Sequence, residues 1–323
     1  AIYKPSENLP RSRSEILERY LEILLSPEKY KIYQGESRPD YLREATESLA
    51  YEGLSKEHIG FSKKEALQHL RKLDYCEKPL EYLESLVKYG VLTNVTGRLQ
   101  FTYPTIQEYF AAKYMLDNNF EEIIEGFEKI IHKPWAQAIQ FALEAHPFSD
   151  EIIKVQLKKS DDAFFTSLRL ITRCVINGAK VEKNTREFLG ELLAKAWPSD
   201  SSAIATNIGY LLLDGFALSL PDEAEDYIIK GWAFHSVGGK ILSVKKDSIL
   251  TEKVLVHMLS KDLHFKYHLH EWQDAVDEIA EKALDLYQER SSSKNTNENE
   301  IDGLRSLINN LDETRISELR WKV

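Results

Sequence analysis

Apolar residues in the first part of the chain recur at every third or fourth position, the spacing that places them on one face of an α-helix. This pattern predicts four helices before residue 91, each with a residue type beside it that favours a helix start or stop. The predicted helices are one opened by the Ser12–Glu15 capping box, one from about Pro39 to Tyr51 stopped by Gly53, one opened by the Ser62–Glu65 capping box, and one from Pro79 to Gly90.

The pattern changes from helical to alternating at residue 91, which predicts a β-hairpin. Its strands are Val91 to Val95 and Arg98 to Tyr103, and the turn between them is Thr96-Gly97. Alternation places three apolar side chains on one face of the second strand: Leu99, Phe101 and Tyr103.

A helix is predicted directly after the hairpin. Pro104 cannot continue a paired strand, and Thr105 to Glu108 has the sequence of a capping box. Few positions between Thr105 and Asp117 are clearly polar. We therefore expect this helix to be buried on most of its sides.

From about residue 120 onward, amphipathic helices follow one another with short connections, which favours a HEAT-like right-handed stack. The predicted helices are Phe120 to Ile131, Trp135 to Ala145, Phe164 to Ile176, Thr185 to Ala196, Ala203 to Leu213, Glu223 to Trp232, Glu252 to Leu259 and Trp272 to Tyr287. Residues 288 to 300, QERSSSKNTNENE, contain no apolar side chain and predict a flexible linker. One more amphipathic helix is predicted from Ile301 onward.

Composition narrows the classes of function. The net charge of -10 argues against a broad, sequence-independent grip on nucleic acid, which needs a surplus of Lys and Arg. The two cysteines, Cys76 and Cys174, lie far apart in apolar surroundings, so we expect core thiols in a reducing, cytoplasmic compartment. No apolar run reaches the roughly 18 residues of a membrane span. The chain starts without Met, and we expect that residue 1 is not the natural start.

At residues 99 to 112 the sequence resembles a signature of NACHT-type STAND NTPases, F-x-H-x-[ST]-Φ-x-E-[FY]-F-A-A. The matching residues are Phe101, Thr105, Glu108, Tyr109 and Phe110, followed by Ala111 and Ala112. The upstream segment LPRSRSEILERYLEILLS is similar to the helical segment that follows the ATPase core in this family. The later KPWAQAIQFALEA is similar to the first helices of its sensor array, so the resemblance covers residues 9 to about 145.

The resemblance implies a mainly α-helical fold, with a winged-helix domain that has a short β-hairpin, followed by a HEAT-like α-helical array. The implied organisation is a helical lead-in after a missing NTPase core at 1–37, the winged-helix domain at 38–117, the array at 118–290, a flexible linker at 291–300 and a C-terminal helix at 301–323.

The resemblance also implies a switch. In this family ADP is held between the NTPase core and the winged helix, and a trigger on the C-terminal repeats favours an open, ATP-bound, oligomerising form. The implied partners are an upstream NTPase domain, a protein trigger on the array and further copies of the chain. ATP or ADP and Mg are expected to bind in the upstream domain, and no cofactor is expected in this chain. The resemblance further implies that the chain is part of a prokaryotic antiviral defence sensor.

Tyr103 stands where the family has a His that reaches the nucleotide phosphates. A phenol can donate a hydrogen bond to a phosphate oxygen, although it carries no positive charge. Tyr103 is therefore the candidate nucleotide contact, and a place in the winged-helix core is the alternative.

No other segment predicts catalysis, so we expect this chain not to be an enzyme. A GxxxxGK[ST] phosphate loop is absent from the sequence, and Gly238-Gly239-Lys240, the nearest match, predicts a turn. Tyr210 to Gly215 resembles a Walker B strand, but the helical spacing before it and Gly215 at its end predict a helix C-terminus. The sequence also lacks a GxSxG elbow.

Two alternatives stay open. His264 and His268 would share a helical face and could begin a metal site near His257 and His270, although surface or interface histidines fit the same pattern. The second alternative is a stand-alone helical scaffold whose winged helix contacts nucleic acid. Its cations would be Lys63, Lys64, Arg71 and Lys72, whereas the next helix carries Glu81 and Glu84. Other lysine doublets, Lys158-Lys159 and Lys245-Lys246, predict solvated faces.

Overall fold

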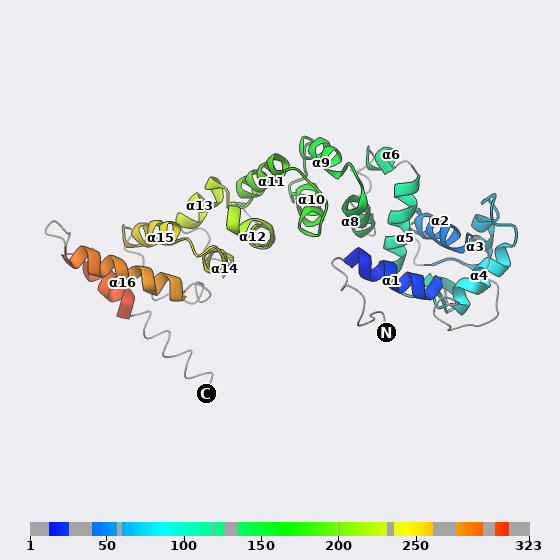
Figure 1. Ribbon diagram of the computed structural model, residues 1–323, viewed down its shortest axis with the longest axis horizontal. Coiled ribbons are helices and arrows are strands. Elements are labelled where there is room, and N and C mark those ends of the chain that lie inside the picture. The colour runs from blue at the N-terminus through cyan, green and yellow to red at the C-terminus, as the bar shows by residue number, and fades with distance from the viewer. Residues whose placement is uncertain are drawn as a thin grey trace, which may run out of the picture. The chain divides into compact units, whose positions relative to one another are not determined.

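The protein is mainly helical and contains a two-stranded antiparallel sheet (Figure 1). The structure, a computed structural model, describes residues 13–25, 41–56, 60–118, 120–125, 135–199, 201–230, 236–260, 276–292 and 301–309. The chain forms two compact units. The first comprises residues 1–160 and 173–182, and the second comprises residues 161–172 and 183–323.

The first unit contains residues 99 to 112, the stretch whose sequence resembles the NTPase signature. Its elements are α1 (Arg13–Leu25), α2 (Leu42–Ser55), α3 (Lys63–Leu70), α4 (Pro79–Lys88), β1 (Leu92–Val95), β2 (Arg98–Phe101), α5 (Pro104–Asp117), α6 (Phe120–Glu125), α8 (Trp135–Ala145) and α9 (Ser149–Leu157). The prediction did not include α9.

The hairpin forms where the sequence predicts it. Thr96 and Gly97 have φ of 50° and 82°, the positive values that a two-residue hairpin turn requires. Before α3, Phe61 exchanges backbone hydrogen bonds of 2.8 and 2.7 Å with Leu99 and so adds a bridge beside β2. The second strand ends at Phe101, so the prediction that it extends to Tyr103, with Tyr103 on the face of Leu99 and Phe101, is wrong.

Gly53 does not end α2, contrary to the prediction, because the helix continues to Ser55. A Cβ at Gly53 would lie 2.6 Å from Gln107 Nε2 and 2.9 Å from Phe61 Cζ. Gly53 is therefore needed for the close approach of α2 to its neighbours, and this packing overrides the low helix propensity of glycine.

The helix of the motif, α5, is buried on most sides, as predicted. It packs against α2 and α8 and also contacts α1, β2 and α6. It begins at Pro104 with Tyr103 as its N-cap, and no side chain caps it. The predicted Thr105 capping box is wrong, because proline at the first helical position already fixes the start. The Ser62–Glu65 capping box of α3 is confirmed by both of its hydrogen bonds.

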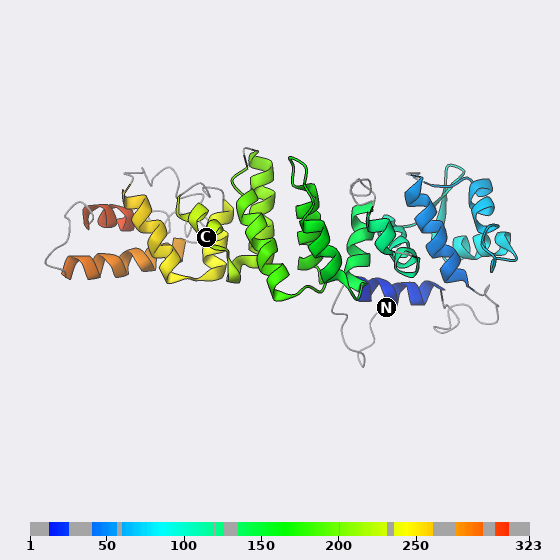
Figure 2. The same cartoon turned by 90° about the horizontal axis from the view of Figure 1, so that it is seen from above.

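The second unit stacks helix on helix. Its elements are α11 (Lys183–Ala196), α12 (Ser202–Phe216), the 3₁₀ helix η1 (Ala217–Ser219), α13 (Asp222–Ile229), α14 (Ser236–Lys245), α15 (Ser248–Ser260), α16 (Val276–Ser292) and the helix 301–309. α11 packs on α12 and α13, α12 on α14, α13 on α15, and α15 on α16 (Figure 2). The helix α10 (Thr166–Ile176) begins in this unit, and its last residues belong to the first.

Three predictions in this unit are wrong. Gly238-Gly239-Lys240 is part of α14 rather than a turn. Residues 288–292 of the predicted linker continue α16. Lys245 is mostly buried instead of solvated, because its Nζ lies 2.8 Å from Glu225 Oε1. The Walker B resemblance at residues 210–215 lies in α12, which confirms the helical interpretation.

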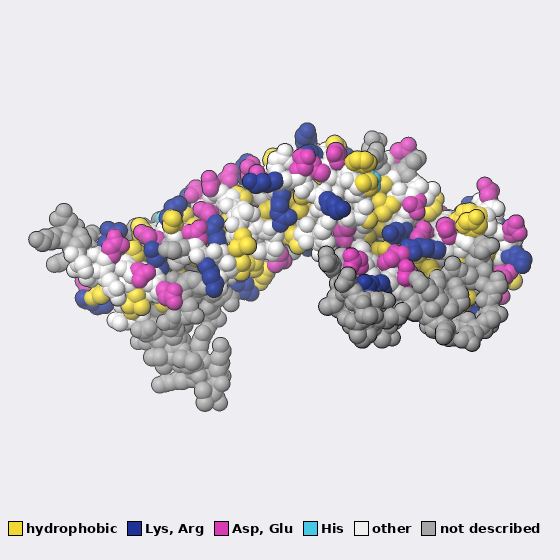
Figure 3. Space-filling model, in the orientation of Figure 1, with side chains coloured by type: hydrophobic (Ala, Val, Ile, Leu, Met, Phe, Trp, Pro, Cys, Tyr) yellow, Lys and Arg dark blue, Asp and Glu magenta, His cyan; other side chains and the backbone are white. Residues whose placement is uncertain are grey.

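On the face drawn in Figure 3, acidic and basic side chains are interspersed over the helices of each unit. None of the helices in the described ranges is by itself long and apolar enough to cross a membrane. The segments Ser202–Ser219 and Asp222–Ile229 reach that length and composition only as a pair, with a bend of 115° between them.

Candidate functional site

The motif residues form part of the core around β2 and the first half of α5. Phe101 and Phe110 are both buried, and their ring centroids lie 6.5 Å apart. Tyr109 is buried as well, whereas Thr105 and Glu108 are half-buried. Burial raises the pKa of the Glu108 carboxyl. Three of the five residues therefore act in packing, and the hydroxyl group of Tyr109 also makes a hydrogen bond outside its own helix.

The Tyr109 hydroxyl donates a hydrogen bond of 2.5 Å to Glu18 Oε2 on α1. The same carboxylate accepts two bonds from Arg43 on α2, from Nη1 at 2.5 Å and from Nη2 at 3.0 Å. Arg43 Nε also donates to Glu47 Oε1 at 2.9 Å. One carboxylate on α1 is thus held by α2 and α5 at once, in the two-pronged geometry that makes arginine–carboxylate pairs strong.

A second polar contact holds the start of α1. Ser14 Oγ donates to Glu144 Oε2 at 3.2 Å on α8, and the Arg13 guanidinium lies 4.9 Å from the centre of the Phe141 ring. The Phe141 ring in turn meets Tyr109 edge-on at 5.4 Å. We call Ser14, Glu18, Arg43, Tyr109 and Glu144 together the α1 clasp, since they fasten α1 to α2, α5 and α8.

Burial and hydrogen bonding shift the pKa values of the titratable groups in and beside the α1 clasp. Burial alone would raise the pKa of Glu18, but the hydrogen bonds from Arg43 and Tyr109 outweigh it and lower this pKa to about 2. Burial raises the pKa of Glu47 to about 7 despite its bond to Arg43. Burial and the bond to Glu18 raise the pKa of the Tyr109 phenol. At neutral pH, Glu18 is therefore the ionised partner of Arg43.

Tyr103, the candidate nucleotide contact, lies at the surface. Its side chain is 54% exposed, and its backbone is extended just before α5. Burial, and after it the Tyr103 phenol, raises the pKa of Tyr20 on α1. The surface position leaves the hydroxyl accessible, and the contact with a nucleotide stays a prediction.

The side chains of Ser48, His69 and Glu52 lie in a row like the hydroxyl, imidazole and carboxylate of a catalytic triad, but a substrate cannot reach the hydroxyl. Ser48 Oγ lies 2.9 Å from His69 Nε2, and His69 Nδ1 lies 3.7 Å from Glu52 Oε1. Ser48 is only 2% exposed, so a substrate carbonyl cannot reach its hydroxyl. The three residues instead tie α3 to the face of α2.

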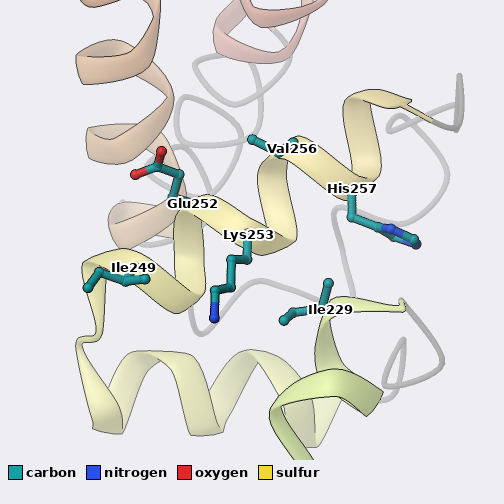
Figure 4. A pocket seen from close by; sticks show the side chains of 6 residues that line it. All are labelled: Ile229, Ile249, Glu252, Lys253, Val256 and His257. Atoms are coloured by element: carbon teal, nitrogen blue, oxygen red, sulfur yellow. The ribbon is translucent and has the colours of Figure 1, made fainter. Parts of the chain in front are cut away.

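A groove runs along the outer face of α15 in the second unit (Figure 4). It is open to solvent and has a volume of about 570 Å³. We call it the α15 groove, and the residues that line it are Ile229, Ile249, Glu252, Lys253, Val256 and His257.

The other candidates give no site in the described part of the chain. His264 and His268 lie outside the described residues. Within the described residues, no group of three or more His, Cys, Asp or Glu side chains is placed to hold a metal ion. Cys76 and Cys174 are both buried free thiols, as predicted.

The sequence did not single out Glu18, the hydrogen-bond partner of Tyr109, or Arg43, which links Glu18 to Glu47. The one readable signal is the spacing of Arg43 and Glu47, which places opposite charges on neighbouring turns of a helix. Glu18 reaches them only through the tertiary fold.

Comparison with known proteins does not assign a function to this chain. No protein-family model matches this sequence, and neither a curated protein nor a solved structure matches it. The functional argument therefore depends on the residues and contacts described above.

Proposed function

We propose that this chain is the non-catalytic regulatory and ligand-sensing half of a NACHT-type STAND ATPase switch. Residues 38–117 would form a winged helix that gates the nucleotide state of an upstream NTPase domain. Residues 118–290 would form a HEAT-like array that binds a protein trigger, after which the protein oligomerises as part of antiviral defence. ATP or ADP and Mg would bind in the upstream domain.

The order of elements in the first unit supports the winged-helix part of the proposal. α2 is followed by the bridge residue Phe61, then by α3 and α4, and then by the hairpin β1–β2. A helix, a short strand, two helices and a two-stranded wing in this order are the parts of a winged helix. The pairing of Phe61 with Leu99 attaches the segment before α3 to the wing.

The packing order in the second unit supports the array. α11, α13 and α15 contact one another in sequence, and α12 contacts α14 in the same way. Alternate helices thus fall into two rows, as they do when helix pairs stack into a solenoid.

The α1 clasp is the observation that carries the proposal. Tyr109, a residue of the family motif, bonds Glu18 in the helical lead-in, and Arg43 holds the same carboxylate. In the proposed switch, α1 is the segment next to the NTPase domain. A movement of that domain would therefore be transmitted to the winged helix through this carboxylate, which gives the motif residue a regulatory function.

The proposal is tested in the longer protein encoded by the natural reading frame. We expect a GxxxxGK[ST] loop upstream, Mg-ATP binding, and ADP that copurifies with the protein. Tyr109→Phe and Glu18→Gln should lower the amount of retained ADP, and Glu84→Gln is the matched control because Glu84 is an exposed carboxylate on α4. An upstream frame without a phosphate loop, or saturable ATP hydrolysis by this chain alone, would contradict the proposal.

A second candidate function, nucleic-acid binding by the winged helix, is favoured by exposed cations around α3. These are Lys63, Lys64, Arg71 and Lys72. Exposed Glu81 and Glu84 on α4 oppose it. Duplex binding that weakens steeply between about 50 and 200 mM salt, and that Lys63→Gln with Lys64→Gln reduces, would favour this function. Unchanged binding in that double variant would exclude it.

A further inference from the structure

The outer face of α15 carries apolar side chains that no described element covers. Ile249 is 68% exposed and Val256 is 42% exposed. They are seven positions apart, so they lie on one face of the helix. Ile229 points toward this face from the end of α13 and completes the apolar lining of the α15 groove (Figure 4). Single exposed apolar residues are common, but a groove that gathers two of them beside the half-buried Ile229 indicates an interaction surface.

Of the two charged side chains Glu252 and Lys253 that line the α15 groove, only Glu252 has an ion-pair partner among the described residues. Glu252 is already neutralised, because its Oε2 lies 2.9 Å from Lys282 Nζ on α16. Lys253 has neither an ion-pair nor a hydrogen-bond partner in the part of the chain that the structure describes. Among the described residues, the groove therefore has one uncompensated cation, Lys253, next to its apolar lining, and this cation is electrostatically complementary to a carboxylate.

We propose that the α15 groove binds an amphipathic helix of a partner protein, with apolar residues in the groove and an Asp or Glu beside Lys253. The lining residues of α15 recur at the spacing of one helix face, which suits apolar anchors at positions i, i+3 or i+4, and i+7 of a bound helix. The groove is open to solvent rather than enclosed, so it fits a protein segment better than a small molecule that needs an enclosed cavity.

This inference rests on the proposed function only where it names the chemistry of the trigger: an acidic, amphipathic helix. The groove and its charges belong to the chain whether or not an ATPase domain precedes it. A helix-binding test on the chain alone and a nucleotide test on the longer protein can therefore fail independently.

The experiment uses the full 323-residue chain and fluorescein-labelled peptides in an anisotropy titration. The first peptide is an alanine-based helix with Leu on one face and Glu along its edge, the second has Lys in place of Glu, and the third has Ser in place of Leu. We expect saturable binding of the acidic peptide, weaker binding of the basic peptide and none of the Ser peptide.

Two variants test the two components of the groove. Ile249→Ser should weaken the acidic peptide about tenfold, as expected for an anchor residue, and its exposure makes loss of folding a minor concern. Lys253→Glu should reverse the preference between the acidic and basic peptides by roughly two- to fivefold in each direction. Lys158→Glu is the matched control, because Lys158 is an exposed lysine at the end of α9, and it should change neither affinity.

The proposal is overturned if the acidic peptide shows no saturable binding, or if Lys253→Glu leaves the preference unchanged. It is also overturned if the chain self-associates and Ile249→Ser abolishes the association. That outcome would assign the groove to a second copy of the chain.

Discussion

Replacing Glu18 by Gln is expected to loosen α1 from the first unit. The amide cannot accept the charge-assisted bonds that Arg43 makes to both carboxylate oxygens. The pKa of Glu18 is lowered from 4.5 to about 2, which corresponds to an upper limit of roughly 3 kcal/mol for the interactions of the ionised form. Because 33% of this side chain is exposed, solvent screening reduces the expected loss to about 1–2 kcal/mol.

The same shift predicts how attachment of α1 depends on pH. A carboxyl whose pKa is lowered by folding stabilises fully above its unfolded pKa and loses that contribution as the pH falls. For Glu18 the loss occurs between about 4.5 and about 2. Glu47 acts in the opposite direction, since burial raises its pKa to about 7 and its ionisation destabilises the fold as the pH rises. Glu18→Gln should remove the acid-side loss and leave the effect of Glu47.

Hydrogen exchange followed by mass spectrometry measures this directly, because it reports the opening of α1 separately from global unfolding. In Glu18→Gln we expect amides of residues 13–25 to exchange about 5- to 30-fold faster at neutral pH, the factor that corresponds to this free energy. Amides of the β1–β2 hairpin should be unchanged, and so should every segment in the Glu84→Gln control. Equal exchange of α1 in Glu18→Gln and wild type would refute the reasoning.

Three further predictions concern stability and thiol access. Gly53→Ala should destabilise the chain by about 1–3 kcal/mol in urea unfolding, because its Cβ would lie 2.6 Å from Gln107 Nε2 and 2.9 Å from Phe61 Cζ; an unchanged midpoint would contradict this packing. Gly97→Ala should cost about 1 kcal/mol in thermal unfolding, because φ at Gly97 is 82°; a stabilised variant would contradict that turn. Burial raises the pKa of the Cys174 thiol, so Ellman's reagent should modify it only as fast as the chain unfolds, and rapid native labelling would contradict its burial.

Features decided by neighbouring residues were predictable from the sequence. Thr96-Gly97 specified the hairpin turn, and Ser62 with Glu65 specified the start of α3, because both depend on local backbone geometry. Glycines gave wrong predictions of helix ends where tertiary packing keeps the residue inside a helix. Gly53 and the Gly238-Gly239 pair favour helix ends locally, yet each lies inside a helix. At Gly53 the close approach of Gln107 and Phe61 gives the reason.

The candidate site was predictable only in part. The resemblance at residues 99 to 112 drew attention to Tyr109, but its partner Glu18 lies 91 positions away in the sequence. Arg43 and Glu18 are separated by 25 positions, so no motif spacing connects them. Which acid and which base meet depends on how α1 lies on α2 and α5, and periodicity within single helices does not contain that information.

Because α5 packs against both α2 and α8, the chain cannot be divided freely at the end of this helix. α5 packs against α2 and β2 and also against α8. In the contact with α8, the ring centroids of Tyr109 and Phe141 lie 5.4 Å apart. A chain divided after residue 117 would separate these rings and expose the apolar side of α5 to water. A shorter chain that keeps this packing would therefore have to include α8, up to Ala145, together with α5.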